Sequence, residues 1–343
     1  MVSIMDKVWF SWEDHRRSRE LANAFGAEYI FLSSYSSRFI RYIKLSISTV
    51  RKLILYRPST VFCQNPSIVL ATVLVLFKRV LNYNLIVDRH SNFKFEHQDS
   101  RSIIWRAFWF LSKYTVKRAD LTIVTNKDLS LVCNSWGGKS AVLPDKIPDL
   151  TVADTDRDSE TPILNDNFTP KVVAITTFDS DEPISDMFEA ARIIGDEFEV
   201  YFTGNYKKRF ISDGAGDLVP KNVTLLGFIP ESSYRVALSR ADVILVLTSK
   251  DLILNCGAYE AVSLNVPMVI ANTKTMTRHF YKGAVSVDLN AASIAAGIRD
   301  CYNKRVSKKE ELRELRLELE KNWAEQFNAV LKEIESIRGK NRS

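Results

Sequence analysis

One segment of the chain combines a helix start that could bind phosphate groups with a carboxylate on the first turns of that helix. It runs from Leu247 to Glu260, from the end of an apolar run, through a loop, to a helix start made of small residues. Backbone N–H groups at the start of a helix bind phosphate groups. The segment therefore predicts a diphosphate site beside Glu260, although Glu260 taken alone would be interpreted as a solvated helix carboxylate.

A basic loop follows another predicted strand. The strand ends at Thr203, Gly204 and Asn205 follow, and Lys207 and Lys208 come shortly after. Lysines at this place could neutralise a departing diphosphate, as a metal ion does elsewhere. Charge runs are also common on solvated loops, and both interpretations stay open.

Histidines and an aromatic residue follow two predicted strands of the first half. His90 comes directly after one strand, with Glu96 on the same loop, and Trp12, His15 and Arg16 follow the first strand. Histidine can donate to a hydroxyl or contact a sugar, or it can be a purely structural hydrogen-bonding group. The loop after the first strand is equally well explained as a capped helix start, because its two acidic residues favour the helix dipole.

The elements that position these loops follow a regular order. Apolar runs alternate with helical segments, as in parallel sheets, and residues 144–170 interrupt this pattern with Pro, Asp, Thr, Ser and Asn. We expect an α/β protein of two doubly wound parallel-sheet domains, residues 1–150 and 171–306. Residues 151–170 form the predicted linker, and 307–343 a final helix that packs back on the body. Ligands of such sheets bind at the carboxyl ends of the strands.

The second half resembles the retaining GT-B glycosyltransferases, in particular glycosyltransferase family 4. The resemblance rests on residues 222–230, 241–243 and 247–271, whose order and spacing are similar to those of that family. It implies two Rossmann-like domains facing a cleft, with residues 1–150 as the acceptor domain and 171–306 as the donor domain. It also implies a UDP- or GDP-linked sugar as donor, no further cofactor, and transfer with retention.

The resemblance also assigns roles to residues. Glu260 takes the ribose hydroxyls of the donor, the amides of Gly257 and Ala258 approach the diphosphate or sugar, and His90 faces the donor sugar. The complete prediction names His90, Asp251, Lys207 and Lys208 as catalytic; Glu260, Gly257, Ala258, Cys256, Gly204, Asn205, Phe228 and Thr248 as donor-binding; and Trp12, His15, Arg16 and Glu96 as acceptor-binding.

The sequence departs from the family at two places. Position 252, eight residues before Glu260, is leucine where the family has an acid, and Asp251 stands one residue early. Either the loop shifts its register so that Asp251 touches the sugar, or backbone groups make that contact. The second departure is the loop 177–182, which is acidic where the family has a basic pair. It contains Asp-Ser-Asp, which binds a metal in the other main glycosyltransferase fold, but these residues also favour turns. We expect a turn and no metal.

Charge is distributed unevenly around a net value of +6. No acidic residue lies between Glu28 and Asp88, whereas eight Lys and Arg residues do. Segment 38–57 places cations beside an apolar helical stripe, which could also be core, and segment 101–118 places them beside aromatic residues. We expect both segments to bind an anionic membrane surface; no nucleic-acid motif is present, so nucleic acid is not an expected partner.

The remaining features concern the compartment. The four cysteines form no CxxC pair, which favours a reducing compartment, and the N-terminus lacks the pattern of a signal peptide. The longest apolar stretch, Ile68–Phe77, is too short to span a bilayer. We expect a cytoplasmic enzyme at the inner face of the membrane that glycosylates a lipid-linked or polysaccharide acceptor in cell-surface glycan biosynthesis. A nucleotide-sugar 2-epimerase and a non-catalytic scaffold of the same fold remain alternatives.

Overall fold

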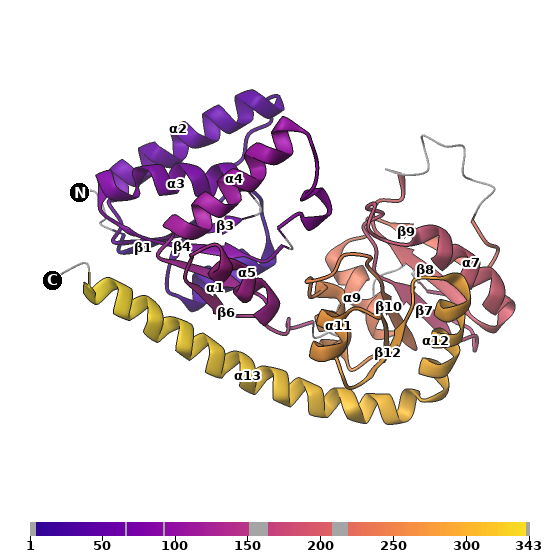
Figure 1. Ribbon diagram of the computed structural model, residues 1–343. Helices are drawn as coiled ribbons and strands as arrows, with labels where there is room; N and C mark the ends of the chain where they lie inside the picture. The colour runs from indigo at the N-terminus through magenta and orange to yellow at the C-terminus, as the bar shows by residue number, and fades with distance from the viewer. Residues whose placement is uncertain (1–4, 66, 92, 151–163, 208–218, 341–343) are drawn as a thin grey trace. The chain divides into compact units, whose positions relative to one another are not determined.

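The computed structural model describes residues 5–65, 67–91, 93–150, 164–207 and 219–340, which form two compact units (Figure 1). Unit 1 takes the chain up to Asp145 and again from Trp323 onward, and unit 2 is Lys146–Asn322. Each unit contains one six-stranded parallel sheet. The two doubly wound sheets predicted from the sequence are therefore confirmed.

The sheet of unit 1 has the strand order β2-β1-β3-β4-β5-β6. Its strands are β1 (Lys7–Ser11), β2 (Glu28–Phe31), β3 (Thr60–Asn65), β4 (Asn84–Arg89), β5 (Leu121–Val124) and β6 (Ser140–Val142). The connections carry α1 (Arg16–Ala24), α2 (Arg38–Tyr56), α3 (Ile68–Leu81), η1 (Phe95–His97), α4 (Ile103–Arg118) and α5 (Lys127–Ser135). The direction of strand addition changes between β1 and β3, so their carboxyl ends form the switch point of this unit.

Helices cover both faces of this sheet. Side chains alternate along a strand, so Val8 and Phe10 of β1 pack with α2 and α3 on one face, whereas Trp9 packs with α1 on the other. The second face is completed by Val330 and Ile334 of the last helix, α13 (Arg305–Lys340). Strand β4 is buried along its whole length, as expected for a parallel strand covered on both sides.

The sheet of unit 2 has the order β12-β11-β10-β7-β8-β9. Its strands are β7 (Lys171–Ala174), β8 (Glu199–Thr203), β9 (Val223–Gly227), β10 (Val243–Val246), β11 (Met268–Ala271) and β12 (Ala284–Val287). Its helices are α7 (Ile184–Ile194), η2 (Gly195–Glu197), α9 (Glu231–Ser239), α10 (Cys256–Leu264), α11 (Lys274–His279) and α12 (Ala291–Asn303). Here the switch point lies between β7 and β10, as in the dinucleotide-binding fold.

The two faces of this sheet also form separate cores. Helices α7 and α12 pack on one face, and α9, α10 and the first half of α13 pack on the other. Leu312 and Leu315 of α13 belong to the second core and are fully buried. Helix α13 therefore supplies core residues to both units.

Candidate functional site

The loops that follow β7 and β10 lie at the switch point of unit 2, and the Asp181 carboxylate connects them. Asp181 follows β7; it accepts a hydrogen bond from the hydroxyl of Thr248 (2.8 Å) and forms an ion pair with Lys250 (2.9 Å), both of which follow β10. The amide of Ser249 donates to the Asp181 carbonyl at 2.7 Å. Burial tends to raise the pKa of Asp181, but the hydrogen bond from Lys250 holds it below its ordinary value. The Asp181 carboxylate is thus ionised and already bound by Thr248 and Lys250.

The loop 177–182 also folds on itself. The Glu182 carboxylate accepts hydrogen bonds from the backbone amides of Thr177 (2.9 Å) and Phe178 (2.7 Å), and Phe178 has a left-handed backbone with φ +59°. Burial raises the pKa of Glu182. The loop is therefore a self-bonded turn, the local structure expected from its Asp and Ser content. Among the described residues, no group of three or more His, Cys, Asp or Glu side chains could hold a metal ion.

The start of helix α10 carries the predicted phosphate-binding amides. Asn255 caps the helix: its side chain accepts from the Gly257 amide (3.1 Å), and its carbonyl accepts from the Ala258 amide (3.1 Å). Gly257 packs closely here: a Cβ would lie 3.0 Å from the side chain of Ile175, directly after β7, so a larger residue would displace that side chain. The structure thus brings these amides to the switch point, with Asn255 as their partner. Cys256, the first residue of the helix, is exposed.

Glu260 lies one turn further along α10 and is only 8% exposed. The hydroxyl of Tyr234, on α9, donates to its carboxylate at 2.6 Å. A carboxylate accepts several hydrogen bonds, so this contact orients the group without exhausting its capacity. The buried position excludes the solvated helix carboxylate that Glu260 would be when taken alone.

Asp251, the displaced acid, lies on the surface of the loop before α10. Its carboxylate accepts from the amide of Leu252 (2.8 Å) and from the hydroxyl of Thr275 (3.3 Å). Leu252 has a left-handed backbone with φ +64°. The irregular backbone lies at position 252, and Asp251 is held beside it by these contacts.

The loop after β8 packs against the end of β9. The amide of Gly204 donates to the carbonyl of Gly227 at 2.9 Å, and Gly204 (φ +94°) has no room for a side chain, since a Cβ would lie 2.0 Å from the Thr176 carbonyl oxygen. Asn205 and Lys207 are exposed, and Phe228 is 93% exposed. Lys208 lies outside the described residues.

In unit 1 a buried arginine joins two carboxylates. The Arg17 guanidinium, on α1, donates to Asp88 at the end of β4 (2.8 Å), to Asp145 (2.9 Å) and to the carbonyl of Leu143 (2.8 Å). Burial tends to raise the pKa of Asp88, but Arg17 and His90 hold it well below its ordinary value. Asp88 is therefore a buried carboxylate that is ionised at neutral pH.

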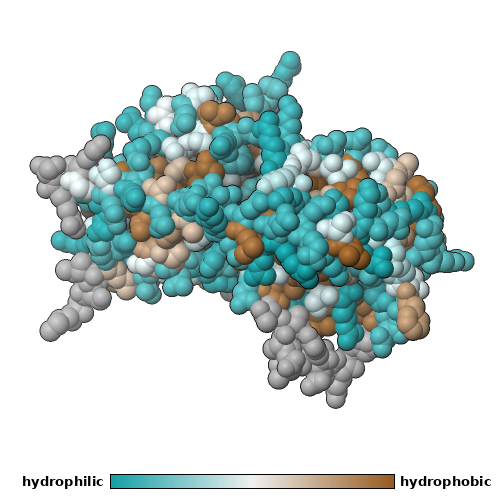
Figure 2. All heavy atoms as spheres, turned by 90° about the horizontal axis from the view of Figure 1, so that it is seen from below, coloured by the Kyte–Doolittle hydropathy of each residue, from teal (hydrophilic) through white to brown (hydrophobic). Residues whose placement is uncertain are grey.

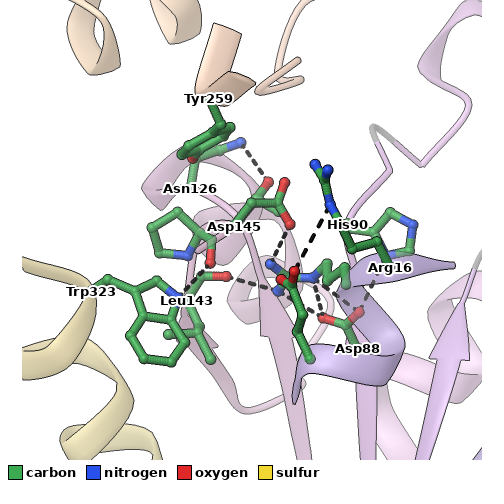
Figure 3. A network of polar contacts seen from close by, with 12 residues as sticks. Arg16, Asp88, His90, Asn126, Leu143, Asp145, Tyr259 and Trp323 are labelled. Atoms are coloured by element: carbon green, nitrogen blue, oxygen red, sulfur yellow. Dashed lines mark hydrogen bonds and ion pairs between the residues drawn. The ribbon is translucent and has the colours of Figure 1, made fainter. Parts of the chain in front are cut away.

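The His90 ring contacts the Asp88 carboxylate (Figure 3). Its Nδ1 is 3.2 Å from the Asp88 carboxylate, and its ring stacks on that of His15 with centroids 4.9 Å apart. Burial, and then the neighbouring His90, lower the pKa of His15 to about 4. Two histidines predicted from separate loops are thus brought together, with His15 neutral at physiological pH.

The other three predicted acceptor contacts each have a partner within unit 1. Trp12 is 7% exposed, and its indole N–H donates to the hydroxyl of Thr49 at 3.1 Å. Arg16 lies 3.9 Å from Glu20 on its own helix. Glu96 is exposed in η1, 3.9 Å from Lys94.

Sequence reasoning missed Arg17 in unit 1 and did not assign a role to Asp181, Lys250 or Tyr234 in unit 2. It chose Arg16 rather than Arg17, although Arg17 stands four residues before Leu21, a spacing that places both on the buried face of α1. It treated Asp181 only as part of a turn and did not single out Lys250. Nothing in the sequence indicated Tyr234, because its contact with Glu260 depends on how α9 packs beside α10.

No family model and no curated protein matches the chain. Among solved structures, it is similar over 95% of its length to sucrose-phosphate synthase from Thermosynechococcus elongatus (TM-score 0.74, 16% identity, 86% of that chain). It is similar over 96% of its length to Anabaena HepE in complex with UDP (0.71, 11%, 100% of that chain). A third similar structure is a protein assigned as a UDP-N-acetylglucosamine 2-epimerase from Listeria monocytogenes (TM-score 0.58, 13% identity, 89% of this chain and 82% of that chain). At these identities the similarity establishes the fold, two Rossmann-like units of the GT-B type.

Proposed function

We propose that the protein is a glycosyltransferase that moves a sugar from a UDP- or GDP-linked donor to a lipid-linked or polysaccharide acceptor. We propose further that transfer is retaining and metal-independent, and that it serves cell-surface glycan biosynthesis at the cytoplasmic face of the membrane. Solved structures of HepE contain UDP and UDP-glucose, which supports a nucleotide-sugar donor. The residues of unit 2 supply the argument for where that donor binds.

The observation that carries the proposal is the placement of Glu260. It is a nearly buried carboxylate in α10, the helix that follows the strand β10 at the switch point, and its orientation is fixed by Tyr234. A carboxylate at this place can accept hydrogen bonds from both ribose hydroxyls, as the acidic residue does in dinucleotide-binding sheets. The start of α10 then lies where the diphosphate follows the ribose, and the helix dipole favours its charge.

Departure of the nucleoside diphosphate needs positive charge or hydrogen-bond donors. Lys250 follows β10 at the switch point and is held by Asp181, and Lys207 follows β8. In the proposed reaction these lysines and the α10 amides stabilise the departing diphosphate. They perform the role that a divalent cation has in metal-dependent transferases.

His90 has a defined orientation for contact with a sugar. Because Asp88 is ionised, it favours a proton on Nδ1 of His90, which leaves Nε2 as an acceptor. A sugar hydroxyl would donate to Nε2. The role of Asp88 and Arg17 is to position this ring, and neither needs to touch the substrate.

The membrane part of the proposal rests on one face of unit 1. The stripe Ile40, Ile43, Ile47 and Ile54 is exposed by 46–51%, and α2 instead uses Leu45, Thr49 and Leu53 as its buried face. The stripe is therefore not core. Further exposed apolar residues on α2, α3 and α4 are Phe39, Leu55, Leu76, Val80, Ile103, Ile104 and Phe110.

This face combines apolar side chains with cations, as interfacial helices do. The surface seen from below is mostly hydrophilic, with apolar residues in scattered patches (Figure 2). Among the described residues, no helix is both long and apolar enough to cross a bilayer. We propose that residues 38–57 and 101–118 bind an anionic membrane surface.

The first test measures thermal stabilisation by a panel of nucleoside diphosphates and their sugars. One sugar nucleotide is expected to raise the melting temperature of the native protein selectively. Glu260→Gln is expected to weaken its binding about tenfold or more, because a hydrogen bond to a charged group is lost. Tyr234→Phe keeps the carboxylate and removes only its orienting partner, so a smaller loss is expected.

A second step separates the alternatives. The identified sugar nucleotide is incubated with the protein, and the products are analysed with and without an acceptor extract. Release of the nucleoside diphosphate that depends on the extract supports transfer. An epimerised sugar nucleotide would support the 2-epimerase, and no stabilisation by any ligand would support the scaffold.

A further inference from the structure

A cavity of about 660 Å³ lies in unit 1 between α2, α4 and the first turn of α3. Its volume is within the range of small-molecule sites, about 300–1,000 Å³. Trp12 and Glu13 in its wall follow β1, and Ser67 and Ile68 follow β3. The cavity therefore opens at the switch point of the sheet, the place where parallel sheets bind ligands.

The wall of this cavity is divided between apolar and cationic groups. Trp12 and Leu45 are buried, and Trp105, Phe108 and Leu111 of α4 add apolar surface. Arg38 and Arg41 come from the first turn of α2, and Lys94 precedes η1. Among the described residues that line the cavity, Glu13 is the one acidic residue, so this lining is net positive.

Two polar atoms of the lining are buried without a partner. Arg41 Nε and Ser67 Oγ make no hydrogen bond within the part of the chain that the structure describes. A buried donor without a partner costs free energy, so a ligand that accepts hydrogen bonds gains affinity here. The guanidinium of Arg41 also favours a negatively charged acceptor, and its planar donors match the oxygens of a phosphate group.

The rim of the cavity shows where an apolar ligand would enter. Ile103 and Ile104 line it and are 81% and 79% exposed. They belong to the same apolar face of α2, α3 and α4 that is proposed to contact the membrane. An alkyl chain could therefore pass from the bilayer into the cavity without crossing water.

We infer that this cavity binds an alkyl phosphate, with the phosphate at Arg41 and Ser67 and the chain against Trp105 and Phe108. The inference rests on the proposed function, since it makes a lipid phosphate the acceptor class. A free sugar phosphate is the competing ligand, because it offers the same anionic oxygens without the chain.

The test titrates the protein with dodecyl phosphate below its micelle concentration and follows binding by calorimetry. Saturable binding is expected, and inorganic phosphate and glucose 6-phosphate should bind at least about tenfold more weakly, because they bury no apolar surface. Equal binding of either one would overturn the alkyl part of the inference. Equal binding of dodecanol would overturn the phosphate part.

Matched variants locate the site. Arg41→Gln should weaken dodecyl phosphate about tenfold, whereas Arg51→Gln removes the same charge from α2 about 15 Å along the helix and should change it less than twofold. Ala107→Trp adds a bulky side chain at the cavity wall without altering charge and should also weaken binding. Equal losses for Arg41→Gln and Arg51→Gln would show general surface attraction and sink the inference.

The result is separable from the donor proposal. Each variant is also tested for stabilisation by the sugar nucleotide, which reports folding and the site in unit 2. Retained donor binding with no binding of dodecyl phosphate to the native protein would reject the cavity as a lipid site and leave the glycosyltransferase proposal standing. If dodecyl phosphate binds but no sugar nucleotide does, only the glycosyltransferase proposal would be rejected.

Discussion

At the scale of single residues, Arg17 is 4% exposed and forms ion pairs with Asp88 and Asp145. Removing one member of a buried ion network leaves the remaining charge uncompensated. Asp88→Asn is expected to lower the free energy of unfolding by about 3 kcal/mol. Urea unfolding measures this loss.

The control for Asp88→Asn is a surface pair in the same unit. Asp14→Asn breaks the contact with Arg19, in which both side chains are about half exposed (51% and 52%). Its cost should stay below about 1 kcal/mol. If the two variants lost equal stability, the network around Arg17 would not be an anchor.

His15 gives a prediction about pH. Its pKa is lowered from 6.5 to about 4, so between these values the unfolded chain binds a proton that the folded chain does not. The free energy of unfolding should therefore fall as the pH decreases from about 6.5 to about 4. Below about pH 4, His15 is protonated in both states and should cause no further change. His15→Phe keeps a ring against His90 and should flatten this part of the stability profile; an unchanged profile would contradict the assignment.

The residues of the site could be predicted only in part. The family resemblance singled out Glu260, and the structure places it in a buried, oriented position. Arg17 could have been found from helical spacing, whereas its contact with Asp145 spans 128 residues. Such a contact depends on the strand order, which residue types alone do not fix.

At the scale of elements, the cap of α10 controls the proposed phosphate site. Asn255 accepts from the Gly257 amide that a diphosphate would use. Asn255→Ala should lower the free energy of unfolding by about 1 kcal/mol, because the helix loses its cap. The same variant should raise the affinity for the nucleoside diphosphate, because the Gly257 amide no longer donates to Asn255.

Asn290 offers a matched control for this cap. It caps α12 in the same way, through the amide of Ser293, and α12 packs on the other face of the sheet. Asn290→Ala should lose similar stability and leave nucleotide affinity unchanged. Weaker nucleotide binding in Asn255→Ala would show that the side chain itself contacts the ligand.

Periodicity predicted most strands and the long helices, because apolar strands and amphipathic helices carry strong patterns. It left α5, β6, α11 and α12 unassigned. Strand β6 has three residues, all half-buried, too few for a pattern. The stripe on α2 was ambiguous for another reason: α2 is apolar on two sides, and only packing decides that Leu45 and Leu53 face the sheet.

At the scale of the whole molecule, membrane binding should be electrostatic and local. Native protein is expected to bind vesicles rich in phosphatidylglycerol, and raising the salt from about 0.1 to 1 M should release it, because the Debye length falls from about 10 to 3 Å. The double variant Lys44→Glu/Arg51→Glu should reduce partitioning about tenfold or more, at roughly 1 kcal/mol per basic residue.

A variant with the same net charge makes this test specific. Lys309→Glu/Lys321→Glu reverses two exposed lysines in the part of α13 that belongs to unit 2, whereas the proposed membrane face belongs to unit 1. It should bind vesicles nearly as well as the native protein. Equal losses in both double variants would mean that only net charge matters and that no face is selected.

Helix α13 has a consequence for synthesis of the protein. Val330 and Ile334 complete the core that begins with Trp9, and Phe327 packs on Phe25 with ring centroids 4.9 Å apart. A ribosome makes the first strands long before these partners, at about 5–20 residues per second. The first residues of unit 1 are therefore synthesised before unit 2, and its last core residues after unit 2. One apolar face of the unit 1 sheet stays uncovered while all of unit 2 is translated.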